Sequence, residues 1–201
     1  LQQGRPLKIW GTALAKESVT VEFAGQNRTA AADADGRWNV TLETLKASPT
    51  PRDLVLRGKD SRTVIHNVLV GDVWLCGGQS NMAMTLRSTV NRDLEIGSAD
   101  FQAIRFLRVP LISRGTPQAD LPTPNPKAGE GNWQLATTEN VGNCTGVGFH
   151  FAKVLHRMLK VPIGLVDNHR LGFGQLANPA CLFFLQGNLP CQRLFNHKHI
   201  I

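Results

Sequence analysis

The stretch Gly-Asp-Val-Trp-Leu-Cys-Gly-Gly-Gln-Ser-Asn-Met, residues 71–82, decides the fold of this chain. Within it, residues 73–76 form a short apolar run, which is typical of a parallel strand buried on both faces. Gly77 and Gly78 follow this run, and Ser80 stands where a helix is expected to begin. A strand, a glycine turn and a helix in this order predict an α/β sheet whose ligands gather where the strands end.

The sequence that follows keeps the same alternation of strands and helices. We expect a polar helix over residues 81–96, a strand over 104–109, an amphipathic helix over 147–159 and a strand over 163–166. A Pro-, Gly- and Asn-rich excursion before residue 132 is long for a compact domain and predicts a functional loop or a surface insertion. The β-α-β-α-β order predicts a parallel sheet with helices on both faces, occupying residues 67–167.

The sequence before residue 67 has a different character, since short apolar-polar runs alternate with turn residues. Val19, Val21 and Phe23 alternate with polar residues, which predicts a strand with one face inward. Asp-Ala-Asp-Gly at residues 33–36 is a tight-turn signal. Residues 1–66 therefore predict a small antiparallel β domain, with strands over 8–10, 18–23, 28–32, 38–42 and 54–56.

Composition limits the classes of partner. The 201 residues carry a formal charge of +7, but Lys and Arg are scattered, so we expect no nucleic-acid partner. No apolar run approaches the length of a membrane span. The four cysteines form no Cys-x-x-Cys pair, so we expect no metal. No signal peptide is visible after Leu1, and the opening residues look truncated.

Ser80 is the candidate nucleophile. Gly77 and Gly78 leave room for a substrate carbonyl to approach the backbone, and the first helical turn offers N–H donors for a developing oxyanion. Asn81 is placed to hold the loop or to donate to the substrate. Taken alone, a strand-Gly-Gly-x-Ser-helix pattern is about as often a phosphate loop or a simple helix cap, so spacing by itself leaves these alternatives open.

Three stretches together resemble one family. Residues 71–82 are similar to the nucleophile block of sialate O-acetylesterases, within the SGNH or GDSL hydrolase superfamily. Asp-Ala-Asp-Gly-Arg-Trp at 33–38 resembles the β domain that precedes the hydrolase core there, and Val-Pro-Ile-Gly-Leu-Val at 161–166 resembles its next core strand. The resemblance implies Ser80 as nucleophile with its backbone N–H in the oxyanion hole. It also implies that Gly78, Gln79 and Asn81 support the loop.

The resemblance also implies an activity. The family removes O-acetyl groups from sialic acid or related carbohydrates through an acyl-enzyme, and the reaction needs a base for the serine proton but no cofactor. The implied partner is an O-acetylated carbohydrate, and the implied location of the intact protein is secreted or periplasmic. Oligomeric state, the acylated sugar and disulfide pairing stay open.

The chain departs from the family after the strand at residues 163–166. The family has a glycine-rich Trp-Gly-Gly-Thr-like block there and an Asp-x-His or Asp-x-x-His motif near the end of its core. Here Asp167-Asn168-His169 follows the strand directly, so we expect a chance match rather than the catalytic pair. We treat residues 168–201 as unmatched. We hypothesise a reading-frame shift near Asn168, which translation of the DNA in the shifted frame tests.

Two hypotheses follow. The first is a serine esterase of the sialate O-acetylesterase type, made of a small β domain and an incomplete α/β hydrolase domain. The alternative is a catalytically incomplete fragment acting at most as a carbohydrate-binding or structural module. A general base for Ser80 separates them, because a free serine hydroxyl is a weak nucleophile.

Overall fold

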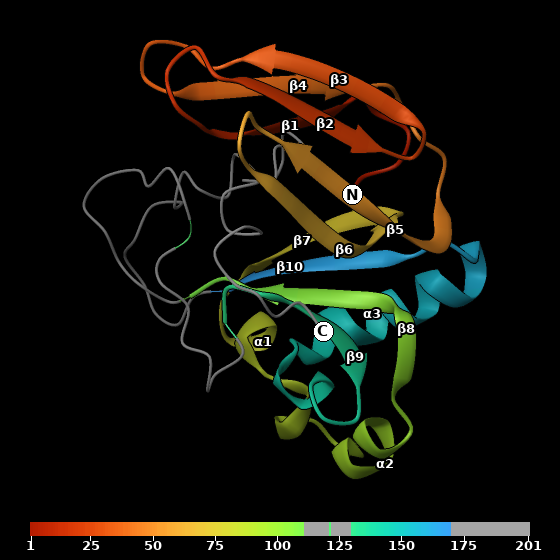
Figure 1. Ribbon diagram of the computed structural model, residues 1–201. Coiled ribbons are helices and arrows are strands. Elements are labelled where there is room, and N and C mark those ends of the chain that lie inside the picture. Colours follow the sequence, from red (N-terminus) through yellow and green to blue (C-terminus); the bar gives the residue numbers. More distant parts are fainter. Residues whose placement is uncertain (111–120, 122–129, 170–201) are drawn as a thin grey trace. The chain divides into compact units, whose positions relative to one another are not determined.

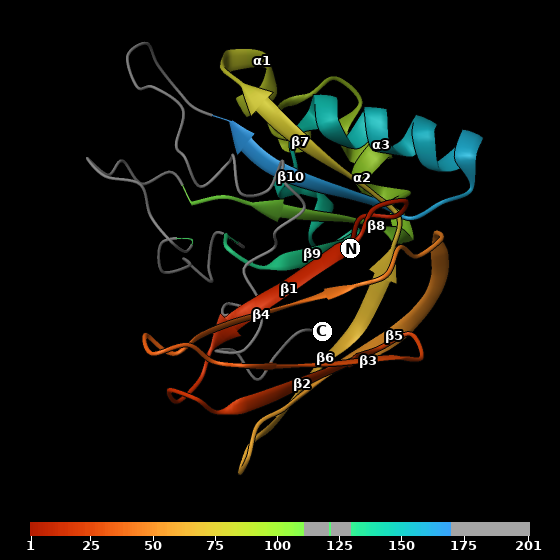
Figure 2. The same ribbon diagram turned by 90° about the horizontal axis from the view of Figure 1, so that it is seen from above.

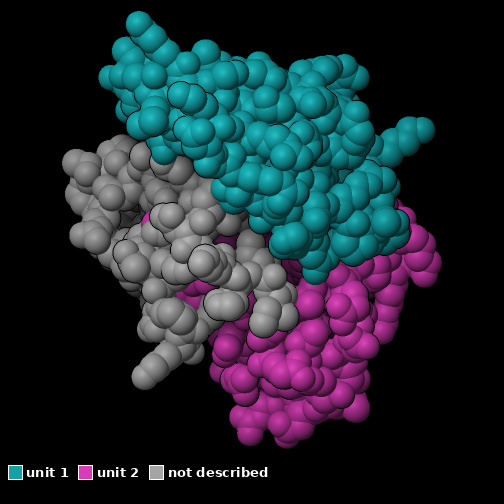
Figure 3. All heavy atoms as spheres, in the orientation of Figure 1, with its two compact units in different colours: residues 1–70, 183–200 teal, residues 71–182, 201 magenta. Residues whose placement is uncertain are grey.

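The structure is a computed structural model and describes residues 1–110, 121 and 130–169. The described chain forms two compact units that meet in sequence at Val70 and Gly71, coloured separately in Figure 3. Among the described residues, the first unit contains only strands, and the second combines strands with helices (Figure 1). The mixed α/β fold class expected from the sequence is confirmed.

The first unit is built from six antiparallel strands. They form a four-stranded sheet in the order β3-β2-β5-β6 and a two-stranded sheet of β1 and β4. All five strands expected from the sequence are present, and β6 is an additional one. The strands are β1 (Leu7–Thr12), β2 (Ser18–Phe23), β3 (Gln26–Ala31), β4 (Arg37–Leu42), β5 (Ser48–Arg57) and β6 (Arg62–Val70).

Period-two alternation builds the core of this unit. Val19, Val21 and Phe23 on β2 are buried, as the alternation predicts. The turn between β3 and β4 also forms as expected, because Asp33 Oδ1 accepts hydrogen bonds from the backbone N of Asp35 and Arg37 at 2.9 and 2.8 Å. Gly36 closes the turn with a φ of +77°, a conformation that glycine adopts without strain.

The second unit is a four-stranded sheet in the order β7-β10-β8-β9. β10 lies between β7 and β8 and runs parallel to both, whereas β9 pairs antiparallel with β8. The three parallel strands were expected, and the antiparallel edge strand β9 was not. The strands are β7 (Asp72–Gly78), β8 (Asp100–Arg108), β9 (Trp133–Thr137) and β10 (Ile163–His169).

The helices of this unit pack on one face of its sheet (Figure 1 and Figure 2). Ile104, Phe106 and Leu165 point from the sheet into the same buried cluster as Phe149 and Ala152 of the long helix. Within the described residues, therefore, helices cover a single face rather than both. The helical segments are α1 (Ser80–Ala83), η1 (Leu86–Ser88), α2 (Arg92–Gly97), η3 (Val141–Asn143) and α3 (Gly146–Leu159).

The prediction of a continuous helix over residues 81–96 is wrong. Met84 has extended backbone, and its carbonyl accepts a hydrogen bond from Gly146 N at 2.8 Å. Leu86 N donates to Cys144 O at 2.9 Å, so the chain pairs with the segment before α3 instead of with its own preceding turn. Asn91 then adopts a left-handed conformation and starts α2 afresh. The Thr- and Ser-rich sequence between Met84 and Asn91 has low helix propensity, which favours the interruption of the helix.

α3 was correctly predicted from its apolar spacing. It begins at Gly146, with Thr145 as its N-cap, and ends before Lys160, whose φ of +57° stops the helix. Its outer side leaves several apolar residues exposed next to the edge strand β7, where Trp74 and Phe151 meet edge to face at 5.0 Å. No helix in the described parts of the chain is long and apolar enough to cross a bilayer.

Candidate active site

Ser80 stands directly after β7, at the C-terminal end of the parallel strands. It is the first residue of α1 and is exposed, as are Gly77, Gly78 and Gln79 before it. The first helical hydrogen bond of α1 is donated by Ala83 N to Gln79 O, at 2.8 Å. The N–H groups at the start of a helix have no partner within it, so the backbone beside Ser80 suits a developing oxyanion.

The turn that carries Ser80 depends on Gly78. Its φ is +152°, and an added Cβ would lie 3.2 Å from Cβ of Met82. Both features disfavour a side chain at this position. Gln79 and Asn81, expected to support the loop, are exposed, and neither side chain makes a hydrogen bond with another residue that the structure describes. Their role therefore stays a prediction.

The support that the structure does show comes from Thr145. This side chain is completely buried and lies at the N-cap of α3. Its Oγ1 donates to Sδ of Met82 at 3.3 Å and accepts a hydrogen bond from Gly148 N at 3.4 Å. One hydroxyl thus connects the nucleophile block to the helix that covers the sheet. The sequence pattern gave no indication of this contact.

Replacing Thr145 with Val is expected to lower the free energy of unfolding of the second unit by about 1 kcal/mol. Val fills the same volume but leaves the buried Gly148 N–H without its acceptor. The matched variant Thr145→Ser keeps the hydroxyl, so its free energy of unfolding should fall by less. Urea titrations followed by far-UV circular dichroism measure both, and equal losses for Val and Ser would contradict a capping role.

Neither described cysteine is a competing nucleophile. Cys76, at the end of β7, is buried, and burial together with the charge of Asp167 raises the pKa of its thiol to about 12. Burial likewise raises the pKa of Cys144 well above its usual value. A thiol with so high a pKa carries almost no thiolate at neutral pH and is inert. The two thiols are therefore excluded as nucleophiles at this end of the sheet, and the role of Ser80 stays a prediction.

A buried acid–imidazole pair lies on the strand next to β7. Nδ1 of His169 is 2.6 Å from Oδ1 of Asp167, and the two residues are only 4% and 1% exposed. The structure joins the two side chains in a hydrogen bond, and the expectation that their letters match an Asp-x-His motif by chance stays a prediction. The signal available in the sequence was their spacing, because residues two apart on a strand point to the same face.

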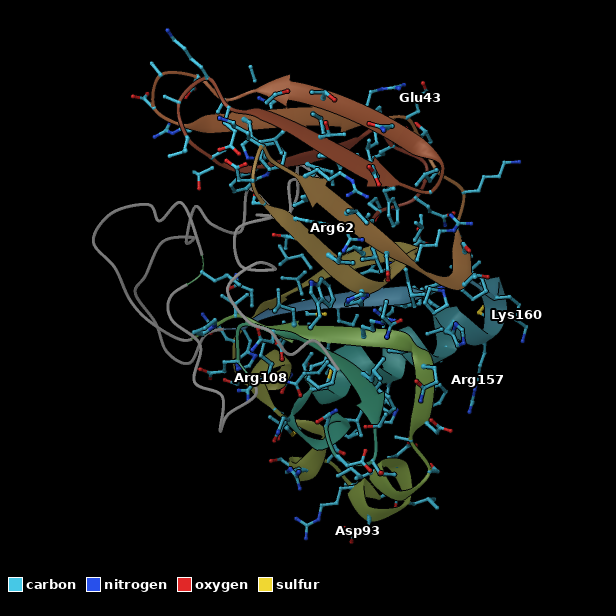
Figure 4. The ribbon with its side chains drawn as sticks, in the orientation of Figure 1. Glu43, Arg62, Asp93, Arg108, Arg157 and Lys160 are labelled. Carbon is cyan, nitrogen blue, oxygen red and sulfur yellow. The ribbon has the colours of Figure 1, made fainter. Side chains whose placement is uncertain are left out.

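Strand register places this pair beside the glycine turn that precedes Ser80. His169 is the Cα partner of Gly78, and Asp167 is the partner of both Cys76 on β7 and Arg108 on β8. Arg108 ends β8 and is labelled in Figure 4. The glycine turn before Ser80 therefore lies at the same end of the sheet as Arg108, Asp167 and His169.

Three further histidines have contacts of their own. His156 Nδ1 is bonded to Val161 O at 2.8 Å, and His66 forms an exposed ion pair with Asp53 at 3.0 Å. His150 packs its ring against Phe149 in α3. No cluster of metal-ligating side chains occurs among the residues that the structure describes. Positions 197 and 199, the two histidines near the C-terminus, lie outside the described residues.

The chain is similar to known carbohydrate esterases. It is 30% identical over 175 residues to the sialate O-acetylesterase of Rattus norvegicus, covering 80% of this chain and 31% of that protein. It is 31% identical over 173 residues to the Homo sapiens enzyme, covering 79% and 32%. The chain thus spans about a third of the length of these curated relatives. No family model matches it.

A solved structure agrees with these relatives. The crystal structure of a carbohydrate acetylesterase from Xanthomonas citri superposes with a TM-score of 0.79 and 36% sequence identity, over 86% of this chain and 38% of that one. The shared fold includes the parallel sheet with its helices. Together, the residue pattern around Ser80, the fold and these relatives show that the chain belongs to the sialate O-acetylesterase family.

Proposed function

We propose that this chain carries the nucleophile of a carboxylic-ester hydrolase that removes O-acetyl groups from sialic acid or a related carbohydrate. The observation that carries the proposal is the position of Ser80, exposed on a glycine turn at the C-terminal end of a parallel strand. Its relatives are sialate O-acetylesterases and a carbohydrate acetylesterase. Acetyl transfer to a serine fits both.

The proposed reaction has two steps. Oγ of Ser80 attacks the acetyl carbonyl carbon while its proton passes to a base, and the tetrahedral intermediate expels the sugar oxygen, which takes that proton back. A water molecule then attacks the acetyl-serine, releasing acetate and restoring the hydroxyl. In the proposed mechanism, backbone N–H groups at the start of α1 stabilise the oxyanion in both steps.

Acetate release from O-acetylated sugars tests this function. We expect the purified chain to release acetate from O-acetylated sialic acid or a peracetylated monosaccharide faster than its Ser80→Ala variant does. Enzyme-coupled detection of acetate measures the rate. If both proteins release acetate equally slowly but bind the deacetylated sugar, the chain is a carbohydrate-binding module without turnover, and the esterase proposal is wrong.

A further inference from the structure

The helix that begins at Ser80 is too short to hold itself in place. α1 is a single turn of four residues, the side chain of Gln79 makes no capping bond, and none of the four residues is buried. Starting a helix costs more free energy than one turn of hydrogen bonds recovers. The position of Ser80 therefore depends on what α1 packs against.

Met82 is the residue of α1 that packs inward. Its side chain is half-buried and lies against the buried cluster of the second unit. Near the backbone it abuts the glycine turn, since a Cβ added to Gly78 would lie 3.2 Å from Cβ of Met82. Farther along the side chain, Sδ accepts the 3.3 Å hydrogen bond from Oγ1 of Thr145. Met82 thus connects the turn before Ser80 to the start of α3.

The backbone of Thr145 holds the chain that leaves α1. Thr145 and Thr85 form an antiparallel bridge. Backbone hydrogen bonds of 2.8 and 2.9 Å flank this bridge, one to each neighbour of Thr85. The side chain of Thr145 therefore contacts α1 itself, while its backbone fixes the segment that directly follows α1.

Thr145 is itself fixed by its surroundings. Its side chain is completely buried, and Oγ1 also accepts a hydrogen bond from Gly148 N at 3.4 Å. Packing there is close, because a Cβ added to Gly148 would lie only 2.6 Å from Cγ2 of Thr145. A thioether is a weak acceptor, so the bond to Met82 contributes orientation more than free energy of folding.

We propose that Thr145, acting through Met82, is a positioning residue for Ser80. This rests on the proposed esterase function. In that reaction the Ser80 hydroxyl and the backbone N–H groups for the oxyanion both belong to the start of α1, so a shift of α1 displaces them together. A misplacement of about 1 Å can slow a reaction by about 10²-fold. Thr145 is completely buried, so it acts through the geometry of α1 and not by touching the substrate.

The test removes each partner of the contact with little change of volume. We expect Thr145→Val and Met82→Leu each to lower kcat for acetate release, and the rate at which a fluorophosphonate probe labels Ser80, by about tenfold to 10²-fold. KM should stay within about twofold, because the contact serves orientation and not substrate binding. Thr145→Ser keeps the hydroxyl and should restore most of the rate. The double variant should be no slower than the slower single variant, because both exchanges remove the same contact.

The matched control is Met158→Leu, the same exchange at a residue of α3 that is 72% exposed, which should react at the wild-type rate. Met82→Leu leaves the cap of α3 intact, so it decides the question if circular dichroism shows that Thr145→Val does not fold. A folded Met82→Leu or Thr145→Val variant that labels within about twofold of the wild-type rate, or losses that add in the double variant, would overturn the positioning role while leaving Ser80 as nucleophile. Absence of both acetate release and Ser80 labelling in the wild-type chain would overturn the proposed function itself.

Discussion

Exchanging Ser80 for Ala is expected to abolish covalent labelling of this chain by a fluorophosphonate probe. The probe traps a serine whose hydroxyl is activated and accessible, and Ser80 is exposed on its glycine turn, whereas both described thiols are buried with raised pKa values. Ester hydrolysis should fall by on the order of 10³-fold or more, because only background stabilisation of the oxyanion remains. Gel fluorescence and acetate release measure the two effects.

Ser88 supplies the control for this experiment. It is an exposed serine in η1, on the same connection between β7 and β8. Ser88→Ala should label and turn over like the wild type. Labelling that persists in Ser80→Ala, mapped by mass spectrometry to another serine, would remove Ser80 from the mechanism.

Phe149→Ala is expected to destabilise the second unit by about 3–5 kcal/mol. The ring is completely buried between sheet and helix, stacks edge on with Phe101 at 5.8 Å, and lies 5.5 Å below the Lys153 ammonium. Removing it leaves a cavity that the surrounding sheet cannot close. Helical circular dichroism during urea unfolding reports this unit, since the described helices all lie after Val70.

Phe151→Ala is the matched comparison on the same helix. Phe151 is 41% exposed and its ring meets Trp74 edge to face, so its loss should cost only about 1 kcal/mol. Comparable losses at the two positions would show that α3 does not pack on the sheet through Phe149.

Local patterns predicted most of the strands and the long helix. Val19, Val21 and Phe23 revealed the inward face of β2, and the α3 spacing revealed its buried side. β5 was predicted only at residues 54–56, because Pro49 and Pro51 make its first half read as a loop. That half is exposed and its register is irregular, so no alternation marks it.

The predictions that failed depend on contacts distant in sequence. The helix expected over residues 81–96 is interrupted because Met84 and Leu86 bond to the segment before α3. The hydrophobic alternation within β9 is weak, and this strand forms because it pairs with β8. The hydrogen bond between Asp167 and His169 was not predicted, although residues two apart on β10 share a face; the expectation that their letters match the family motif by chance stays a prediction.

The central position of β10 also sets the order in which this unit folds. β7 and β8 do not pair with each other, and each bonds to β10, the last described strand along the chain. During synthesis β7 and β8 each keep an unpaired edge until β10 inserts between them. Parallel pairing of strands that are distant in sequence is slow. The turn of Ser80 gains its strand neighbour only at that final step.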